Sequence, residues 1–409
     1  MHPYSFTGAQ PPPLAFAQVS AGAPGYFVSE FGVTSMASYE LMSPAFSPEH
    51  WGVHTLPWRF RSHSTDSMAL SYFGASDVLD HVGELPLKNA LYMSMLAQAL
   101  FYKSQIEGWR STNLHGSLTW DLGEVWQTAG WGSLEYGAKG VAGAVEGGRW
   151  KPSHYVLKQV FADVIVACGW LTGDPEATEN AFSCYIKNDG IAAVATARIS
   201  IELWHLSGSG REASRWRTPL GEMSAPLQSV GATPATAEDF GLVWFCPTGE
   251  RLRGGAGCSV PVSEILEQHG CARNGTDCVL NISVTDRHGG AILAENTVVL
   301  ANPTEIDCGP SSVEATVLPP AVDANGRLEI KVASDESAAC WVVLTTKAEG
   351  RFSENGFFVL PDQPRTVEYI PFEGGDLAPA QQEGGGGGHN VLAETLRVEH
   401  LYPVMHPPK

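Results

Sequence analysis

The carboxylate of Glu30 is the first candidate for chemistry in this sequence. It belongs to the tetrapeptide Ser29-Glu30-Phe31-Gly32, which directly follows the apolar run Tyr26-Phe27-Val28. A short buried strand that delivers a carboxylate into a glycine-containing turn is typical of (β/α) barrels, because these folds keep their chemistry at the C-terminal ends of the strands. The tetrapeptide therefore predicts a catalytic carboxylate, and the alternative is a Glu that starts a loop.

The elements that would position Glu30 alternate between strand and helix over residues 1–162. Residues 26–28 and 116–120 have the short apolar pattern of buried strands. Residues 88–107 contain no Pro or Gly, and their apolar side chains alternate with polar ones such as Gln98 at helical spacing, which predicts an amphipathic helix. A second such helix is predicted over residues 151–162. This order predicts an α/β region with two units of a (β/α)8 TIM barrel, too few to close it because each parallel strand needs neighbours.

The pattern changes to all-β from about residue 163. Apolar residues from Ala195 to Leu203 alternate with polar ones, which predicts a half-buried antiparallel strand. Short strands separated by turn residues continue to residue 302, and a second all-β stretch follows. The predicted domains are therefore 1–162, 163–302 and 303–409, and each of the last two fits a β-sandwich. The glycine-rich stretch 374–390 is predicted to be a flexible surface insertion.

Charge and composition exclude several classes of protein. The 409 residues carry a net charge of −19, which argues against nucleic-acid binding. No apolar run is long enough for a transmembrane helix, so no membrane partner is expected, and the first residues do not resemble a signal peptide. The eight Cys residues include no CxxC pair, and no metal site is expected; disulfides and reduced core thiols both remain open. Sequons at Asn274 and Asn281 give mild support to a lumenal location.

Three further motifs follow the Glu30 motif in order. They are Trp120-Asp121-Leu122-Gly123-Glu124, then Gly148-Arg149-Trp150-Lys151-Pro152-Ser153-His154-Tyr155, and finally Gly350-Arg351-Phe352-Ser353-Glu354-Asn355-Gly356-Phe357. Together the four motifs resemble the second half of the β-mannosidases of glycoside hydrolase family 2. The resemblance implies the C-terminal part of a catalytic (β/α)8 barrel, followed by two immunoglobulin-like β-sandwich domains.

The resemblance also implies an activity. It is the removal of terminal non-reducing β-D-mannose residues from oligosaccharides or glycoproteins by a retaining mechanism, with a β-mannoside as the substrate and without a cofactor or metal. It implies a lysosomal or secreted location, with the cytoplasm as the alternative, and leaves the oligomeric state open. Another exo-β-glycosidase of the family, acting on galactosides, glucuronides or glucosaminides, and a non-catalytic carbohydrate-binding or scaffold fragment are the alternatives.

The resemblance makes Glu30 the catalytic nucleophile. A retaining glycosidase pairs an ionised carboxylate with a protonated carboxylic acid about 5–5.5 Å away. In the family the acid belongs to an upstream Asn-Glu dipeptide, and this sequence contains none. We therefore expect a truncated chain that lacks the general acid/base and is inactive by itself. Asp121 and Glu124 are not expected to replace the acid.

Several aromatic and charged residues are assigned by the same comparison. Substrate contact is expected for Trp131, and contact and packing both remain open for Trp120 and Trp126. We expect Trp150 to be a core residue. Structural roles are expected for the other residues of the last two motifs. Arg149 and Lys151 are expected to form ion pairs, and His154 and Tyr155 to pack in the core. Phe352 and Asn355 are expected to shape a turn. The Gly- and Ala-rich segment 137–147 is longer than the family typically has, which puts the substrate fit in doubt.

Overall fold

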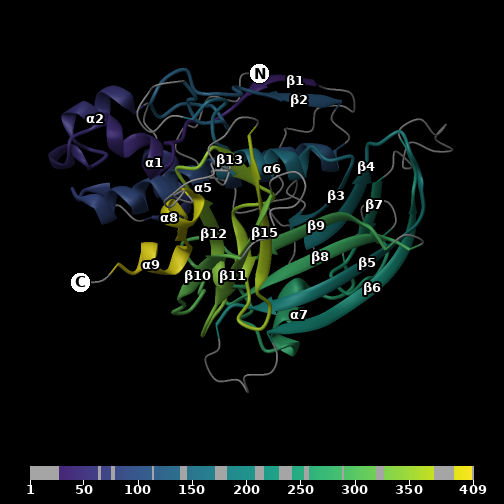
Figure 1. The fold of residues 1–409 in the computed structure, drawn as a ribbon. Helices are drawn as coiled ribbons and strands as arrows, with labels where there is room; N and C mark the ends of the chain where they lie inside the picture. Colours follow the sequence, from purple (N-terminus) through teal and green to yellow (C-terminus); the bar gives the residue numbers. More distant parts are fainter. Residues whose placement is uncertain are drawn as a thin grey trace, which may run out of the picture. The chain divides into compact units, whose positions relative to one another are not determined.

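The helices and strands fall into two units, each built from separated stretches of the chain (Figure 1). Unit 1 comprises Met1–Phe31, Phe101–Leu118 and Val156–Asp307, and unit 2 comprises Gly32–Leu100, Thr119–Tyr155 and Cys308–Lys409. The computed structural model describes residues 27–62, 66–74, 79–112, 115–138, 145–170, 182–207, 216–229, 242–252, 258–287, 290–318, 327–372 and 391–407. The predicted division into three domains remains a prediction.

The strand that carries Glu30 differs from the expectation in two ways. Glu30 lies inside β1 (Phe27–Phe31), one residue before its end, and not in a turn after the strand. β1 and β2 (Gly116–Thr119) form a two-stranded sheet, and the side chains of Phe27 and Leu118 are more than half exposed. The predicted burial was wrong because, among the described residues, no further strand joins this sheet and covers its faces. That this region is the C-terminal part of a (β/α)8 barrel remains a prediction.

The two predicted helices are confirmed as α5 (Glu84–Ser111) and α6 (Pro152–Val160). α5 is longer than predicted and is buried on most of its circumference, because apolar residues occupy nearly every position from Leu87 to Tyr102. Shorter helices precede it: α1 (Tyr39–Met42), η1 (Ser43–Ala45), η2 (Pro48–His50), α2 (Leu56–Arg61) and α3 (Asp66–Phe73). None of the helices within the described ranges is long and apolar enough to cross a membrane.

Two antiparallel sheets of unit 1 share one hydrophobic core. The first has the order β3-β4-β7 and the second the order β6-β5-β8-β9. Alternate side chains of β5, from Ala197 to Leu203, are buried in this core, as the period of two predicted. The element bounds are β3 (Val164–Trp170), β4 (Phe182–Asn188), β5 (Val194–His205), β6 (Arg217–Leu227), β7 (Leu242–Phe245), α7 (Val262–Gln268), β8 (Cys278–Asp286) and β9 (Ile292–Val299).

Unit 2 contains a second pair of sheets around its own core. One sheet has the order β10-β11-β15-β13 and the other the order β14-β12-β16. The predicted insertion 374–390 lies outside the described residues. The element bounds are β10 (Val313–Val317), β11 (Leu328–Ser334), β12 (Ala339–Thr345), β13 (Gly350–Phe352), β14 (Phe357–Val359), β15 (Arg365–Pro371), α8 (Val391–Thr395), β16 (Arg397–Glu399) and α9 (Leu401–Met405).

All eight cysteines form disulfides, which resolves the alternative that the sequence left open. The pairs are Cys168–Cys184, Cys246–Cys258, Cys271–Cys278 and Cys308–Cys340. Each pair closes a short loop within the β-rich part of the chain. Cross-links of this kind stabilise a fold chiefly by restricting its unfolded state.

Candidate functional site

The backbone of Glu30 is anchored by the residue that follows it. Phe31 is buried and packs edge-on against Tyr102 and Trp109 of α5, with ring centroids 5.6 and 4.5 Å apart. Edge-to-face aromatic contacts of this kind add to the stabilisation from burial. The half-buried Glu30 side chain therefore extends from a strand end that α5 holds in place.

The glycine of the Glu30 motif is required by a close backbone approach in unit 2. A Cβ atom placed on Gly32 would overlap the carbonyl oxygen of Trp120 and would lie 3.2 Å from the ring of Trp131. The two tryptophans therefore meet at the same glycine, two residues after Glu30 along the chain. About half of the Trp120 side-chain surface is exposed, Trp131 is half-buried, and the Trp120–Asp121 peptide bond is cis.

We expect Gly32→Ala to lower the melting temperature of the chain clearly, because a backbone carbonyl cannot move aside as a flexible side chain can. Overpacking of this kind typically costs about 1–3 kcal/mol. Gly123→Ala is the matched control, since the added methyl group would meet only Leu134, at 3.8 Å. Equal thermal unfolding midpoints for the two variants would show that the contact between Gly32 and Trp120 does not constrain the fold.

The loop that carries Trp126 and Trp131 has a defined shape. Ser35 and Gly130 exchange two backbone hydrogen bonds of 2.8 and 3.0 Å, so the loop is joined to the segment after Glu30. Within the loop, the carbonyl of Leu122 accepts hydrogen bonds from the backbone amides of Ser133 and Leu134, at 3.1 and 2.9 Å. These bonds fix the backbone around Trp131 without using its ring.

A buried ion pair lies beneath this loop. Lys151 Nζ is 2.6 Å from Glu124 Oε1, and the two side chains are 0% and 4% exposed. Lys151 also lies 3.3 Å from the hydroxyl oxygen of Ser35. Charges removed this far from water are tolerated only when they are paired and hydrogen-bonded. The pair therefore joins the Trp120–Glu124 motif to the Gly148–Tyr155 motif.

Gln98 of α5 forms hydrogen bonds with the same segments of the chain. Its amide nitrogen donates to the carbonyl oxygens of Val33 and Trp131, at 2.9 and 3.1 Å. Its amide oxygen accepts from the hydroxyls of Ser35 and Ser153, at 2.9 and 2.7 Å. The helical pattern placed Gln98 on a solvated face, but the side chain is fully buried, because both of its ends have protein partners. Its position among apolar residues of a long helix is the one sequence signal that could have indicated burial.

Burial shifts the pKa of two carboxyl groups, one in the ion pair and one beside it. It raises the pKa of Glu124, and the ammonium of Lys151 opposes that shift. Burial likewise raises the pKa of Asp121, again opposed by Lys151. Asp121 Oδ1 is buried and has no hydrogen-bond partner among the described residues. Glu124 is thus paired with Lys151, whereas Oδ1 of Asp121 accepts no hydrogen bond from the described residues.

Trp126 is engaged with α2. The guanidinium of Arg61 lies over its ring at 4.8 Å from the centroid, and Phe60 packs edge-on at 6.1 Å. One face of Trp126 is therefore occupied by a cation. The sequence left substrate contact and packing open for Trp126, and these contacts favour packing.

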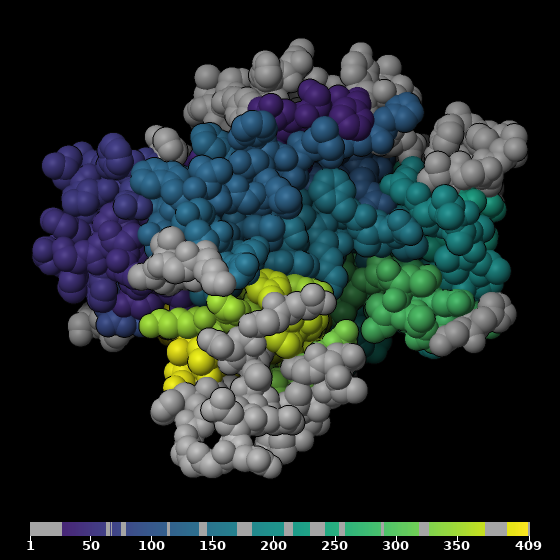
Figure 2. Space-filling view, turned by 45° about the horizontal axis from the view of Figure 1, so that its top comes forward, coloured from purple at the N-terminus to yellow at the C-terminus, as the bar shows by residue number. Residues whose placement is uncertain are grey.

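The last two motifs pack against each other within unit 2. Arg351 lies over the ring of Trp150 at 4.6 Å, and the backbone amide of Phe352 donates to the hydroxyl of Tyr155 at 3.0 Å. Figure 2 shows the yellow-green surface of the last strands meeting the blue surface of the segment before residue 155. The expected packing role of Trp150 is confirmed.

The structural roles expected for the neighbouring polar residues are also confirmed. Arg149 forms a buried ion pair with Glu135 at 2.9 Å, as Lys151 does with Glu124. Asn355 exchanges two hydrogen bonds of 2.8 Å with the backbone of Leu344 and so shapes the turn between β13 and β14. His154 and the hydroxyl of Ser133 form a hydrogen bond. Burial lowers the pKa of His154 to about 4, and the nearby Arg351 adds to this shift.

Comparison with known proteins identifies one matching family model and several relatives. The Ig_mannosidase family model, described as an Ig-fold domain, matches residues 313–402. Beta-mannosidase A of Aspergillus oryzae is 28% identical over 210 residues, which are 45% of this chain and 21% of that protein. Beta-mannosidase of Capra hircus is 28% identical over 159 residues, 34% of this chain and 16% of that protein. Beta-mannosidase A of Aspergillus fumigatus is 23% identical over 377 residues, 86% of this chain and 36% of that protein.

These matches cover a larger share of this chain than of the relatives. The chain matches only 16% to 36% of the length of these curated relatives. Among solved structures, a tetra-tandem repeat from the extending region of a large adhesion protein aligns with 52% of the chain and 42% of that structure, at 16% identity and a TM-score of 0.16, which is too low to support any argument. The match to the mannosidase Ig-fold domain and the three relatives show that the chain is similar to β-mannosidases of the glycoside hydrolase family 2 type.

Proposed function

We propose that this chain supplies the nucleophile side of a retaining exo-β-mannosidase. The observation that carries the proposal is the close approach of Gly32, the last residue of the Glu30 motif, to the carbonyl of Trp120 and the ring of Trp131. A catalytic carboxylate and aromatic rings on adjoining segments are what a sugar site needs, since flat apolar rings bind the faces of sugar rings. The names of the relatives indicate the glycoside, which is a β-mannoside.

The proposed reaction is a double displacement. The ionised carboxylate of Glu30 attacks the anomeric carbon, the glycosidic bond breaks, and a covalent mannosyl-enzyme forms that water then hydrolyses with overall retention. Trp131 contacts the sugar, and Trp120 contributes its exposed ring to the same site. The leaving oxygen needs a proton from a second carboxylic acid. We propose that this acid comes from outside the printed sequence, and that Asp121 and Glu124 do not replace it.

The proposed location is lysosomal or secreted. Four disulfides within one chain are typical of oxidising compartments and are rare in the cytosol. The sequon at Asn274 is exposed and compatible with a passage through the secretory pathway, whereas Asn281 is buried in β8 and accepts a hydrogen bond from Thr297. Detection of an N-linked glycan at Asn274 of the natural protein would support this location.

A panel of aryl β-glycosides tests the proposed activity. The natural protein that contains this chain should hydrolyse the β-mannoside faster than the matched galactoside, glucuronide and N-acetylglucosaminide, and proton NMR should show β-mannose as the first product. The 409-residue chain alone should lack measurable turnover, because loss of the general acid removes about 10²–10⁴-fold of the rate. Preference for another glycoside would overturn the assigned sugar, and comparable turnover by the isolated chain would overturn the need for an external acid.

A further inference from the structure

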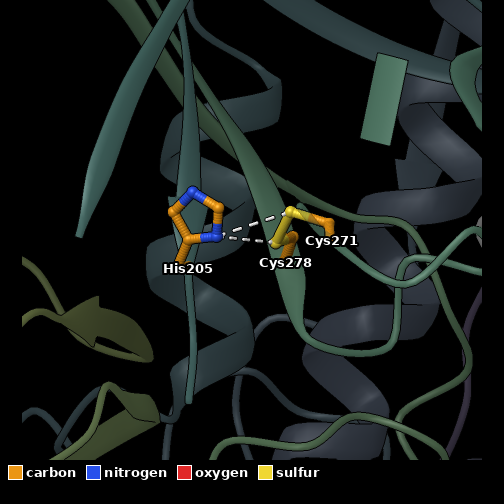
Figure 3. Close-up of side chains that lie close together, drawn as sticks. All are labelled: His205, Cys271 and Cys278. Carbon is orange, nitrogen blue, oxygen red and sulfur yellow. Dashed lines mark hydrogen bonds between the residues drawn. A yellow bond between two sulfur atoms is a disulfide. The ribbon is translucent and has the colours of Figure 1, made fainter. Parts of the chain in front are cut away.

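Buried ionisable groups of the two units differ in how their charges are balanced. In unit 1, His205 lies against the Cys271–Cys278 disulfide, and Figure 3 shows one of its ring nitrogens directed at both sulfur atoms. Because these sulfurs are bonded to each other, this group contains no thiol that could ionise. In unit 2, Glu40 of α1 and Glu399 of β16 share one cation, Arg397. Two carboxylates around one guanidinium leave an excess negative charge when both acids are ionised.

The three side chains of unit 2 form one continuous cluster. Nε and Nη2 of Arg397 lie 3.0 and 3.2 Å from the two carboxylate oxygens of Glu40, so this contact is bidentate. Nη1 of Arg397 contacts Oε1 of Glu399. The side chains of Glu40, Arg397 and Glu399 are 5%, 16% and 12% exposed. The cluster is therefore largely removed from water, where an unbalanced charge is costly.

The two carboxyl groups of this cluster are not equally satisfied. Burial would raise the pKa of Glu40, but the charge and the hydrogen bonds of Arg397 outweigh burial and lower it. The hydroxyl of Thr345 in β12 also donates to Oε1 of Glu40, at 3.2 Å. In contrast, Oε2 of Glu399 is buried and has no hydrogen-bond partner among the described residues. Burial raises the pKa of Glu399 to about 7, with Arg397 opposing this shift and Glu40 adding to it.

The groups of α5 that face the cluster do not remove its excess charge. Lys88 lowers the pKa of Glu399, but its ammonium already lies 2.6 Å from a carboxylate oxygen of Glu84 and over the ring of Tyr39. Tyr92 is fully buried, and its hydroxyl donates a hydrogen bond to a backbone carbonyl. Burial raises the pKa of Tyr92 well above its usual value, so this phenol stays neutral.

The other charged groups nearby are also occupied or neutral. Arg149 acts on Glu40 from a distance, but it forms its ion pair with Glu135. His400 follows Glu399 in the chain, and burial lowers its pKa to about 4, with Asp335 opposing the shift. The imidazole of His400 is therefore uncharged above about pH 5. As pH falls from neutral, Glu399 is the group of this cluster that takes up a proton first.

The cluster joins two segments that are far apart in the sequence. Glu40 lies in α1, which follows the Glu30 motif after a short connection. Glu399 lies in β16, where it is paired with Val343 of β12 in the Ig-fold segment. The attachment of α1 to this sheet therefore depends on how Arg397 is shared between the two acids.

We propose that Glu40, Arg397 and Glu399 form a pH-sensitive latch between α1 and β16, closed in acid and loosened near neutral pH. In acid, Glu399 is neutral, and Glu40 and Arg397 form a balanced pair. When Glu399 loses its proton, the second buried negative charge competes for Arg397 and destabilises the closed state. Because the pKa of Glu399 is raised on folding, its contribution is complete below about pH 4.5 and is lost as pH rises through about 7.

Hydrogen–deuterium exchange of the 409-residue chain tests the latch, because it measures local opening separately from global unfolding. After correction for intrinsic exchange rates, the amides of α1 should open more at pH 7.5 than at pH 5.5. In Glu399→Gln, whose amide has nearly the shape of the neutral acid, this difference should disappear. At pH 7.5 the wild type should open at least about 10-fold more than Glu399→Gln, since each unit of pKa shift is a factor of ten. At pH 5.5 the two proteins should match.

Two further variants assign the effect to the shared arginine. Glu329→Gln, at an exposed position of β11, is the matched control and should keep the wild-type pH dependence. Glu40→Gln leaves Glu399 as the only acid of the cluster at Arg397, so α1 should open more at both pH values and without a difference between them. Equal opening of the wild type at both pH values would overturn the proposal, as would a folded Glu399→Gln that retains the pH dependence. If Glu399→Gln does not fold, Glu40→Gln decides, and a persisting pH dependence in that variant refutes the latch.

Discussion

Glu30→Gln should reduce the proposed β-mannosidase turnover of the natural protein at least about 10³-fold, because the amide has nearly the shape of the carboxylate but cannot attack the anomeric carbon. Phe31 packs against α5 in either case, so the strand end should keep its position. The measurement is the initial rate on an aryl β-mannoside, with the thermal midpoint recorded for each protein. Glu329→Gln, which removes the same charge from an exposed position on β11, should leave the rate unchanged.

A second measurement separates a nucleophile from a residue that only supports the site. In Glu30→Ala, azide can occupy the space of the lost carboxylate and attack the sugar directly. A single displacement inverts the anomeric centre, so the expected product is α-mannosyl azide. A variant that keeps wild-type turnover, or that loses it without forming this product in azide, would contradict the nucleophilic role of Glu30.

Lys151→Met should destabilise unit 2 by about 3–5 kcal/mol, the usual cost of removing one partner from a buried ion pair. Glu124 would then remain almost completely buried without its cation. Urea denaturation, followed by tryptophan fluorescence, measures the change in the free energy of unfolding. Lys331→Met is the matched control, because Lys331 is exposed on β11 and should contribute little.

The penalty of Lys151→Met should also depend on pH. Burial already raises the pKa of Glu124, and loss of the lysine raises it further. A carboxyl whose pKa is higher in the folded state stabilises the fold below its unfolded pKa and loses that contribution as pH rises through the folded pKa. The variant should therefore be closest to the wild type near pH 4–5 and furthest from it near pH 8. Lys151→Met/Glu124→Gln should recover at least half of the loss, and a double variant no better than the single one would contradict this account.

Residues governed by one strong local rule could be predicted from the sequence. The period of two along β5 and the absence of Pro and Gly in most of α5 defined these elements, because side-chain burial alternates with the backbone repeat. The packing roles of Trp150 and Asn355 were also predictable, since both belong to motifs whose structural part does not depend on a ligand.

Contacts that depend on distant segments could not be predicted in the same way. The partner of Lys151 is Glu124, 27 residues earlier, and nothing in a helical or strand period specifies that pair. Gln98 was misplaced because a polar residue in a helix usually faces water, and its four partners come from segments far from it in sequence. The predicted burial of β1 was wrong, because burial of both strand faces requires neighbouring strands, and only β2 pairs with β1 among the described residues.

The contacts of Arg351 with Trp150 and of Phe352 with Tyr155 bear on how such a gene can evolve. The segment that matches the Ig-fold family, residues 313–402, resembles an exchangeable module. Yet this segment packs against residues 150–155, where α6 begins. In addition, the hydroxyl of Tyr92 in α5 donates a hydrogen bond of 2.8 Å to the Trp341 carbonyl. Recombination at the border near residue 310 would separate side chains that have adapted to each other, so the two segments are expected to be inherited together.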